Sequence, residues 1–480
     1  MTGARSNAVA ASADPAVRCA LASLALSMLL SSLGTSVANV ALPTLAQAFA
    51  ATFQDVQWVV LAYLLAITTL IVGVGRLGDT VGRRRLLLAG FFIFTVASVL
   101  CGAAPTLWLL VSARAAQGVG AAVMMALTLA FVGETVPKEK TGGAMGLLAT
   151  MSAIGTALGP SLGGILIAGL GWRAIFLVNL PLGLLTLLLA HRSLPVDRRM
   201  PKADRAGFDH LGTLLLALTL AAYALAMTMG RGSFGPLNIV LLSAAGLGVS
   251  LFIRAERRAA SPLIRLAMFC DRALSAGLAI GVLVATVMMA TLVVSPFYLS
   301  GALGFDPALV GLVVSVGPLV VALTGVPAGR MTDRFGAERM TIVGLAAIGV
   351  GSFVLSTMPM TLGVPGYVAA LVVLTAGYAL FQTANNTDVM ADVSRDQRGV
   401  VSGMLNLSRN LGLVTGASLM GAVFAYASGT ADVTTAHPDA VAAGMRTAFA
   451  IAAILMAGAL FIAIASRRTM RSRSTSSSSP

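Results

Sequence analysis

Long apolar runs separated by short polar gaps repeat along the whole chain. Each run is about 20 residues long, the length that an α-helix needs to cross a ~30 Å hydrocarbon layer. Strands of a membrane barrel would alternate apolar and polar residues over about ten positions, and these runs do not alternate. Because lipid offers no partners to backbone groups, the pattern predicts an all-α membrane protein.

The pattern predicts fourteen transmembrane helices. Their approximate limits are 20–48, 55–75, 86–104, 107–132, 143–169, 174–191, 210–229, 236–253, 274–299, 307–328, 339–357, 365–390, 400–426 and 443–465. The first apolar stretch is about 30 residues long, whereas the apolar core of a signal peptide is about 7–15 residues. We therefore expect the first span to be permanent.

The positive charges indicate the orientation of these spans. The chain carries 32 Lys and Arg residues. If the amino terminus is cytoplasmic, 27 of them fall in cytoplasmic segments, Arg173, Arg231 and Arg446 fall outside, and Arg114 and Arg409 lie within apolar runs. This bias follows the positive-inside rule and predicts that both termini are cytoplasmic.

Composition narrows the function classes. Only 10% of the residues are charged, against about 25% in a soluble domain. The net charge of +14 lies in the gaps between apolar runs, which favours membrane orientation over nucleic-acid binding. The three histidines are scattered and the three cysteines form no CxxC pair, so we expect no metal site, no cofactor and no enzyme activity.

Two pairs of segments reveal an internal repeat. GRLGDTVGR (75–83) reappears 254 residues later as GRMTDRFGA (329–337). VPKEKTGGAMGLL (136–148) resembles VSRDQRGVVSGML (393–405) at an offset of 257. Each pair is eight spans apart, so both copies face the same side and the repeat is parallel. The repeat predicts two six-helix bundles related by an axis normal to the membrane, with two inserted helices between them.

This repeat predicts five regions. They are a cytoplasmic N-terminal segment (1–19), an N-terminal six-helix bundle (20–191), charged loops with two additional transmembrane helices (192–272), a C-terminal six-helix bundle (273–466) and a disordered basic, serine-rich tail (467–480).

Five motifs carry a resemblance to a known family. They are NVALP (39–43), GRLGDTVGRRR (75–85), LVSARAAQGVG (110–120), GTALGPSLGG (155–164) and WRAIFLVNLPLG (172–183). In this order they resemble the signatures of the major facilitator superfamily, in its branch of fourteen-span drug:proton antiporters. The resemblance covers nearly the whole chain and implies transport by alternating access.

The resemblance also implies roles for single residues. Asp79, with Arg83 facing the cytoplasm, would latch the two halves in one state, and Asp333 lies at the equivalent position of the repeat. Asp79 can accept hydrogen bonds at an N-terminal helix end. Arg114 with Gln117 would take part in proton coupling, because a charge inside an apolar run is costly and needs partners.

Small residues in the fifth span form the antiporter helix motif. Gly155, Gly159 and Gly163 recur at intervals of four residues and allow close helix crossing. Gly164 continues the motif, and Pro160 removes one backbone hydrogen bond and bends the helix. Packing alone explains much of this pattern, and the resemblance relates the bend to the direction of antiport.

One acidic residue of the family pattern is missing. The position after Leu33, where the antiporters carry an aspartate, is Gly34. Glu134 and Asp388 are the carboxylates that could replace it, although both could also be solvated helix ends. Asp388 could pair with Arg409 from the next span.

Polar and soft side chains within the spans are candidates for a substrate cavity, although each could equally be ordinary helix packing. The candidates are Asn39, Tyr63, Met124, Tyr298, Tyr378, Gln382, Asn385, Asn386, Asn406 and Arg409.

The sequence therefore predicts a monomeric inner-membrane exporter that exchanges drugs or other small amphipathic molecules for protons, with the lipid bilayer as its other partner. The alternative is an exporter of an endogenous metabolite or neutral compound on the same fold, with altered proton coupling at Gly34. A passive channel has no need of the repeated Gly-Arg-x-x-Asp loops, and the chain has no catalytic cluster to support a membrane enzyme.

Overall fold

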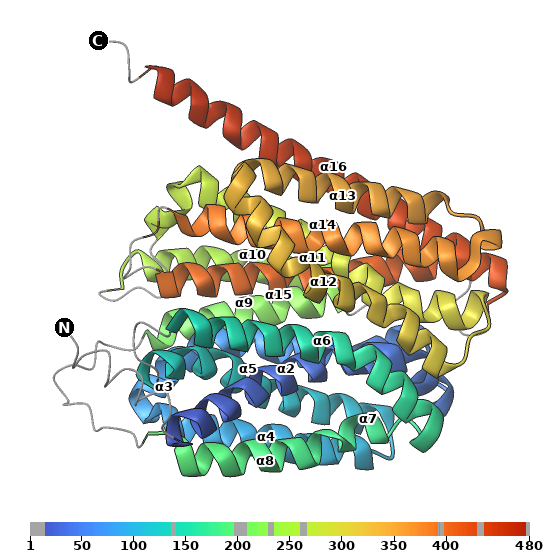
Figure 1. Cartoon of the computed structure of the whole chain (residues 1–480), viewed down its shortest axis with the longest axis horizontal. Helices are drawn as coiled ribbons and strands as arrows, with labels where there is room; N and C mark the ends of the chain where they lie inside the picture. The colour runs from blue at the N-terminus through green and yellow to red at the C-terminus, as the bar shows by residue number, and fades with distance from the viewer. Residues whose placement is uncertain are drawn as a thin grey trace.

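The computed structural model describes residues 15–135, 141–195, 209–228, 235–259, 266–391, 393, 398–429 and 436–476 (Figure 1). The first half of the chain forms α2 (Pro15–Ala48), α3 (Phe53–Val81), α4 (Arg83–Ala103), α5 (Leu107–Thr135), α6 (Thr141–Leu170), α7 (Ala174–Leu177) and α8 (Asn179–Ser193). Next come α9 (His210–Thr228) and α10 (Pro236–Glu256). The remainder forms η3 (Leu266–Cys270), α11 (Arg272–Phe297), η4 (Tyr298–Ala302), α12 (Pro307–Phe335), α13 (Ala337–Thr357), η5 (Met360–Leu362), α14 (Gly363–Ala391), α15 (Arg398–Ala427) and α16 (Pro438–Ser476).

The predicted spans are confirmed as helices. Within the described residues, 13 helical stretches are long and apolar enough to cross a membrane, and the shorter apolar helix Leu211–Met227 occupies the predicted seventh span. The sixth span contains two helices, α7 and α8, because Pro181 has no N–H to donate to the carbonyl of Leu177.

The predicted disordered tail is wrong over part of its length. Helix α16 continues to Ser476, and residues 477–480 lie outside the described structure. The stretch from Ala465 to Ser476 contains no glycine or proline, and arginine is a good helix former, so nothing in it ends the helix.

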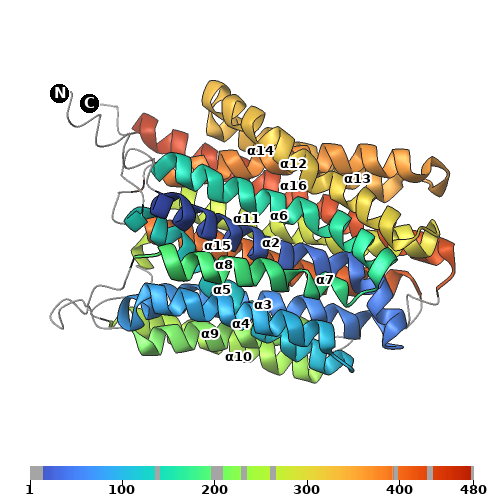
Figure 2. The same cartoon turned by 60° about the horizontal axis from the view of Figure 1, so that its bottom comes forward.

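The helices form two bundles, one from each half of the chain, with α9 and α10 inserted between them in sequence. In Figure 1 the blue-to-green helices lie below the orange and red ones. Helices α9 and α10 pack against each other, and α9 also contacts α3 of the first bundle and α15 of the second. Figure 2 shows α9 and α10 side by side next to α3.

Glycine turns confirm the repeat found in the sequence. Gly82 separates α3 from α4 with φ 109°, and Gly336 separates α12 from α13 with φ 87°. Both conformations favour glycine, because a Cβ is strained at positive φ. Since successive long helices alternate in direction, both turns lie at the same end of the molecule. We call it the basic end, because Arg83–Arg85 and Arg334 lie there.

The turn is tighter than the sequence suggested. Helix α3 continues to Val81, so Asp79 lies in its last turn and not at the N-terminal end of a helix of its own. The side chain of Asp79 lies outside the described part of the structure. Asp333 occupies the equivalent last turn of α12, where it is exposed.

Small residues bring matching helix pairs together in the two halves. A Cβ on Gly155 would collide with the backbone of Leu29 in α2, and one on Gly159 would collide with Ser36. In the second half, Gly412 and Gly416 of α15 approach the backbone of α11 in the same way, at Val282 and Thr286. The α2–α6 pair thus corresponds to the α11–α15 pair, as the offset of 257 residues predicts.

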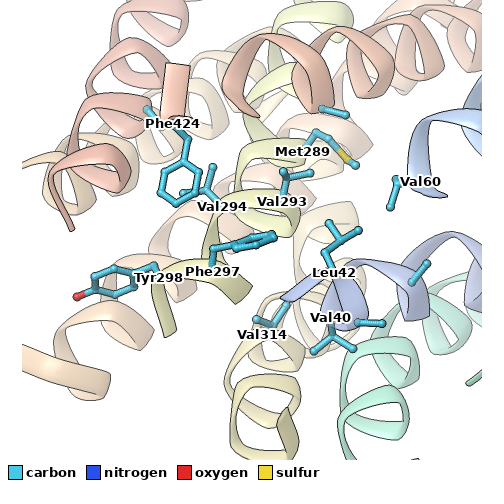
Figure 3. Packing of buried hydrophobic residues seen from close by; sticks show 14 of the residues in the cluster. Val40, Leu42, Val60, Met289, Val293, Val294, Phe297, Tyr298, Val314 and Phe424 are labelled. Atoms are coloured by element: carbon cyan, nitrogen blue, oxygen red, sulfur yellow. The ribbon is translucent and has the colours of Figure 1, made fainter. Parts of the chain in front are cut away.

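The largest buried apolar cluster joins the two halves at the end opposite the basic end. Figure 3 shows Leu42 of α2, Met289 of α11 and Val314 of α12 gathered in this cluster, with Val60 of α3 beside them. Nearer the basic end, a second cluster contains residues of the N-terminal half alone, and a third joins α9 and α10 to the C-terminal half. The two halves therefore share their main core at one end only.

Candidate functional site

A cavity of about 450 Å³ lies between the two halves. The N-terminal half contributes Met28, Leu148, Ser152, Ala153 and Thr156. The C-terminal half contributes Met288, Thr291, Leu292, Val314, Gly317, Pro318, Val321, Tyr367, Leu371, Thr375, Tyr378, Gln382, Thr383, Asn386, Arg409 and Leu413. A volume of this size accommodates a drug-sized ligand.

The cavity wall is apolar with a band of neutral polar groups. Hydroxyl groups come from serine, threonine and tyrosine, and amides come from Gln382 and Asn386. Arg409 is the one charged side chain among the described residues that line the cavity, and no carboxylate is among them. Such a wall holds an amphipathic molecule through apolar contacts and orients it through a few hydrogen bonds.

Aromatic rings from both halves pack together at the end opposite the basic end. The ring of Phe53 in α3 lies 4.6 Å from the ring of Phe297 in α11 and 5.6 Å from that of Phe424 in α15. All three side chains are buried, and Phe53 crosses from the N-terminal half into the C-terminal half. This cluster joins the two halves at that end, and we call it the gate because a relative tilt of the halves would separate its rings.

Two further contacts between the halves accompany this gate and are related by the internal repeat. In the first, Gly164 of α6 meets Gly311 of α12 so closely that a Cβ on Gly164 would lie 3.1 Å from the Cα of Gly311. In the second, Gly421 of α15 meets Gln57 of α3. The offsets of the repeat pair Gly164 with Gly421 and Gln57 with Gly311. The first contact joins two backbones, whereas the second involves a movable side chain.

Replacing Gln57 with leucine is expected to loosen the gate. The Nε2 atom of Gln57 donates a 3.1 Å hydrogen bond to the carbonyl of Ala417 across the two halves. Such a bond contributes about 1 kcal/mol, so the population open at this end should rise about fivefold. The measurement is the rate at which an impermeant thiol reagent, added from that side, labels a cysteine introduced at Thr291. Gln54→Leu, one turn away on α3, is the control, and equal rates in both variants would contradict the prediction.

Arg114 is fully buried in the N-terminal half, away from the cavity. Its Nε donates to the carbonyl of Val59 at 2.9 Å, and one terminal nitrogen donates to Oε1 of Gln117 at 2.5 Å. Gln117 in turn donates to the hydroxyl of Ser98 in α4 at 2.7 Å. The second terminal nitrogen, Nη2, has no hydrogen-bond partner. Among the described residues, no carboxylate forms an ion pair with this guanidinium.

The ring of Tyr63 covers Arg114 from α3. The Cζ atom of the guanidinium lies 4.1 Å from the ring centroid, within the range of a cation–π interaction. The hydroxyl of Tyr63 donates to the carbonyl of Ser31 at 2.9 Å, and a Cβ placed on Gly34 would lie 3.1 Å from this hydroxyl. Gly34 and Arg114 therefore pack on the same tyrosine, so the missing acid leaves this buried cation with neutral neighbours.

The structure places four of the ten cavity candidates in the cavity wall: Tyr378, Gln382, Asn386 and Arg409. The other six lie elsewhere: Asn39, Tyr63 and Met124 inside the N-terminal half, Tyr298 beside Tyr367 at the end of α11, Asn385 against Gly277, and Asn406 on α15 outside the lining.

The charged candidates are spread over the basic end. Arg83 begins α4 and Asp388 lies in the last turn of α14, and neither lines the cavity. Glu134 lies in the last turn of α5, and its side chain is outside the described part. Among the described residues Arg409 has no hydrogen-bond or ion-pair partner, so the predicted pair of Asp388 with Arg409 is not formed in this structure.

Sequence reasoning missed the hydroxyl groups of the wall. Ser152, Thr156, Thr291, Thr375 and Thr383 line the cavity, but an isolated serine or threonine in an apolar helix usually bonds to its own backbone. Thr375, for example, donates to the carbonyl of Leu371 at 2.7 Å. The 3.6-residue spacing from Thr375 through Tyr378 to Gln382 and Asn386 was the available signal.

A cavity between two repeated helix bundles, which are joined at one end by contacts between them, defines a membrane transporter and not an enzyme. A comparison with family models agrees, since the model described as Major Facilitator Superfamily matches residues 24–417 and 278–479. The chain belongs to the major facilitator superfamily.

Curated relatives are transporters of this kind. The chain is 30% identical to the riboflavin transporter RibZ of Clostridioides difficile (strain 630) over 450 residues, covering 94% of this chain and 97% of RibZ. It is 32% identical to the multidrug resistance protein Stp of Mycobacterium tuberculosis over 400 residues, covering 81% and 72% of the two chains. It is 30% identical to the multidrug efflux pump LfrA of Mycolicibacterium smegmatis over 447 residues, covering 91% and 88%.

Solved structures share the fold at low sequence identity. One is a bacterial homologue of the human lysosomal transporter Spinster, inward-facing and unoccupied, with a TM-score of 0.66, 17% identity and coverage of 95% of this chain and 98% of that chain. Another is the nucleoside transporter NupG, with a TM-score of 0.65, 13% identity and coverage of 93% and 99%.

Proposed function

We propose that this transporter exports drugs or other small amphipathic molecules across the inner membrane in exchange for protons. The cavity carries the proposal, because it lies between the two halves, which are joined at one end by contacts that a relative tilt of the halves would break. Relatives named as multidrug resistance and efflux proteins support the direction and the substrate class.

The charge bias supports one orientation in the membrane. By the positive-inside rule, the basic end and both termini would be cytoplasmic. The Phe53–Phe297–Phe424 gate would then be closed toward the outside, as in an inward-facing state. Substrate would enter from the cytoplasm or the inner leaflet and leave after the gate opens and the basic end closes. Asp79, Arg83 and Asp333 would latch the halves in that second state.

Proton flow supplies enough energy for export. One charge crossing the membrane is worth about 2.3 kcal/mol per 100 mV, and one pH unit adds about 1.4 kcal/mol. Since about 1.4 kcal/mol corresponds to a factor of ten, one proton sustains a gradient of several hundredfold. We place the coupling on Arg114 with Gln117 and on the carboxylates Asp79, Glu134, Asp333 and Asp388. Of these groups, Arg114, Gln117, Asp333 and Asp388 are described and do not line the cavity.

Expression in a pump-deficient host tests the export. The minimal inhibitory concentration of at least one amphipathic drug is expected to rise fourfold or more, and cellular dye efflux is expected to stop when an uncoupler collapses the proton gradient. Efflux that continues unchanged with the uncoupler contradicts proton coupling. Unchanged susceptibility to every drug in a broad panel contradicts drug export.

A second candidate is export of an endogenous or neutral compound on the same fold. It is favoured by Gly34, which removes an acid suited to cationic drugs, and by the relative RibZ, which is named a riboflavin transporter. Counterflow of riboflavin in vesicles, with no change in drug susceptibility, would favour this candidate. Counterflow also distinguishes either carrier from an open pore, which does not support it.

A further inference from the structure

The described residues of the cavity wall carry positive charge and no negative charge. Arg409 supplies a fixed positive charge, and the remaining described lining residues are apolar or neutral. Arg409 has an exposed side chain, and none of the described residues bonds or pairs with it. A cation without a counter-charge in a confined, partly apolar space attracts an anion more strongly than it would in water.

Neutral polar side chains of α14 line the same cavity as this cation. They include Gln382, Thr383 and Asn386. The amide N–H groups of Gln382 and Asn386 can donate to an oxyanion held by Arg409, whereas the hydroxyl of Thr383 already donates to the carbonyl of Ala379 at 2.9 Å. The arginine itself presents a planar fork of N–H groups that matches a carboxylate, sulfonate or phosphate.

The nearest carboxylate on α14 lies on another face of that helix. Asp388 is two residues beyond Asn386, about 200° around an α-helix, and it does not line the cavity. Asn385, on a third face, is buried against Gly277 of α11. The positive charge is thus not balanced by any described group of the wall.

Other residues of the wall suit an apolar body. Met28 of α2, Leu148 of α6, Leu292 of α11 and Val321 of α12 also line the cavity. Burying an aromatic or alicyclic ring system here gains about 25 cal/mol for each Å² removed from water. The cavity therefore offers one anchor for an acidic group and an apolar volume for the rest of the molecule.

We propose that the transported molecule is an amphipathic organic anion whose acidic group binds Arg409 and whose ring system fills the apolar part of the cavity. This proposal rests on the carrier function proposed above and names its substrate class. Exporting an anion from a cytoplasm that is electrically negative is also favoured by the membrane potential, at about 2.3 kcal/mol per 100 mV for each charge.

Matched probes test the charge preference. The three probes are 2-naphthalenesulfonate, 2-naphthalenesulfonamide and 2-naphthyltrimethylammonium, which share one ring system and differ in permanent charge. A second set on an anthracene scaffold covers larger substrates. Purified full-length protein is reconstituted in phosphatidylcholine vesicles, so that no anionic lipid occupies the cavity, and equilibrium binding and counterflow are measured for each probe.

The sulfonate is expected to bind at least tenfold more tightly than the ammonium analogue in at least one set. Arg409→Gln should weaken sulfonate binding about tenfold to one-hundredfold and leave the sulfonamide within about twofold, since a hydrogen bond to a charged group is lost. Arg409→Lys should restore binding in part, because the charge returns without the fork. Arg254→Gln, which removes an exposed charge on α10 outside the cavity, is the control.

Three results would overturn the anion assignment. They are equal or tighter binding of the ammonium analogue, failure of both sulfonates to bind, and an unchanged sulfonate affinity in Arg409→Gln. Counterflow measurements distinguish a wrong charge class from failure of the proposed carrier function. If the neutral or cationic probe shows counterflow, the carrier function stands and the charge class is wrong. Binding without counterflow of any probe contradicts the carrier function itself.

Discussion

Replacing Gly164 with alanine is expected to reduce transport at least tenfold in a protein that still inserts and folds. A Cβ at this position would collide with the carbonyl of Pro307 and would lie 3.1 Å from the Cα of Gly311. These are backbone atoms of the other half, so they cannot move aside as a side chain would. Overpacking of this kind costs about 1–3 kcal/mol, and here the cost falls on the closed form of the gate alone.

The internal repeat supplies a matched control. A Cβ on Gly421, the counterpart of Gly164, would meet only the amide end of Gln57, which can rotate away. Gly421→Ala should therefore keep most of the transport, although displacing Gln57 breaks its hydrogen bond to Ala417 and should speed labelling only about as much as Gln57→Leu does. Gly169→Ala on α6 introduces the same methyl group into open space and should have no effect. The measurements are counterflow and labelling of a cysteine at Thr291 from the gated side, which should accelerate in Gly164→Ala. Similar activity in all three variants would show that the α6–α12 contact does not control the gate.

Replacing Arg114 with methionine is expected to reduce transport more than tenfold without lowering the thermal unfolding temperature. The guanidinium is fully buried, its Nη2 has no hydrogen-bond partner, and no described carboxylate compensates its charge. Replacing a buried charge with an apolar side chain of similar length is often neutral or stabilising, because the desolvation cost disappears. An arginine that stabilises the fold would behave differently, since its loss would lower both the transport rate and the thermal unfolding temperature.

The expected separation of activity from stability is what identifies a functional arginine. Transport and thermal unfolding are measured on the same detergent-purified variant and after reconstitution. Arg446→Met, which removes an exposed arginine, serves as the matched substitution. A fall in unfolding temperature by several degrees in Arg114→Met, in parallel with activity, would indicate that the network of Val59, Gln117 and Ser98 is structural. Full transport in this variant would remove Arg114 from the coupling proposal.

The sequence predicts the helices and the repeat well because both can be recognised in short stretches of sequence. Apolar runs fix the spans, and the glycines at Gly82 and Gly336 mark the same turn in both halves. Helix ends were less certain: α12 continues to Phe335 because nothing in residues 329–335 stops a helix, although these residues are polar enough to leave the bilayer.

The site was harder to predict because it depends on which face of each helix meets the other half. Tyr63 and Tyr378 are both tyrosines in apolar spans, yet the first covers Arg114 and the second lines the cavity. Arg114 and Arg409 are both arginines in apolar spans, yet one is buried within a half and the other faces the space between halves. Periodicity alone cannot separate these cases, since every face of a membrane helix can be apolar.

Helix α14 supplies seven of the residues around the cavity: Tyr367, Leu371, Thr375, Tyr378, Gln382, Thr383 and Asn386. It packs against helices of its own half and takes no part in the Phe53 gate or the α6–α12 contact. If the proposed export is correct, mutations along this one stretch are expected to alter what the transporter accepts without disturbing how it cycles. Selection under a new toxic compound would then act on these seven codons, while the contacts that join the two halves stay unchanged.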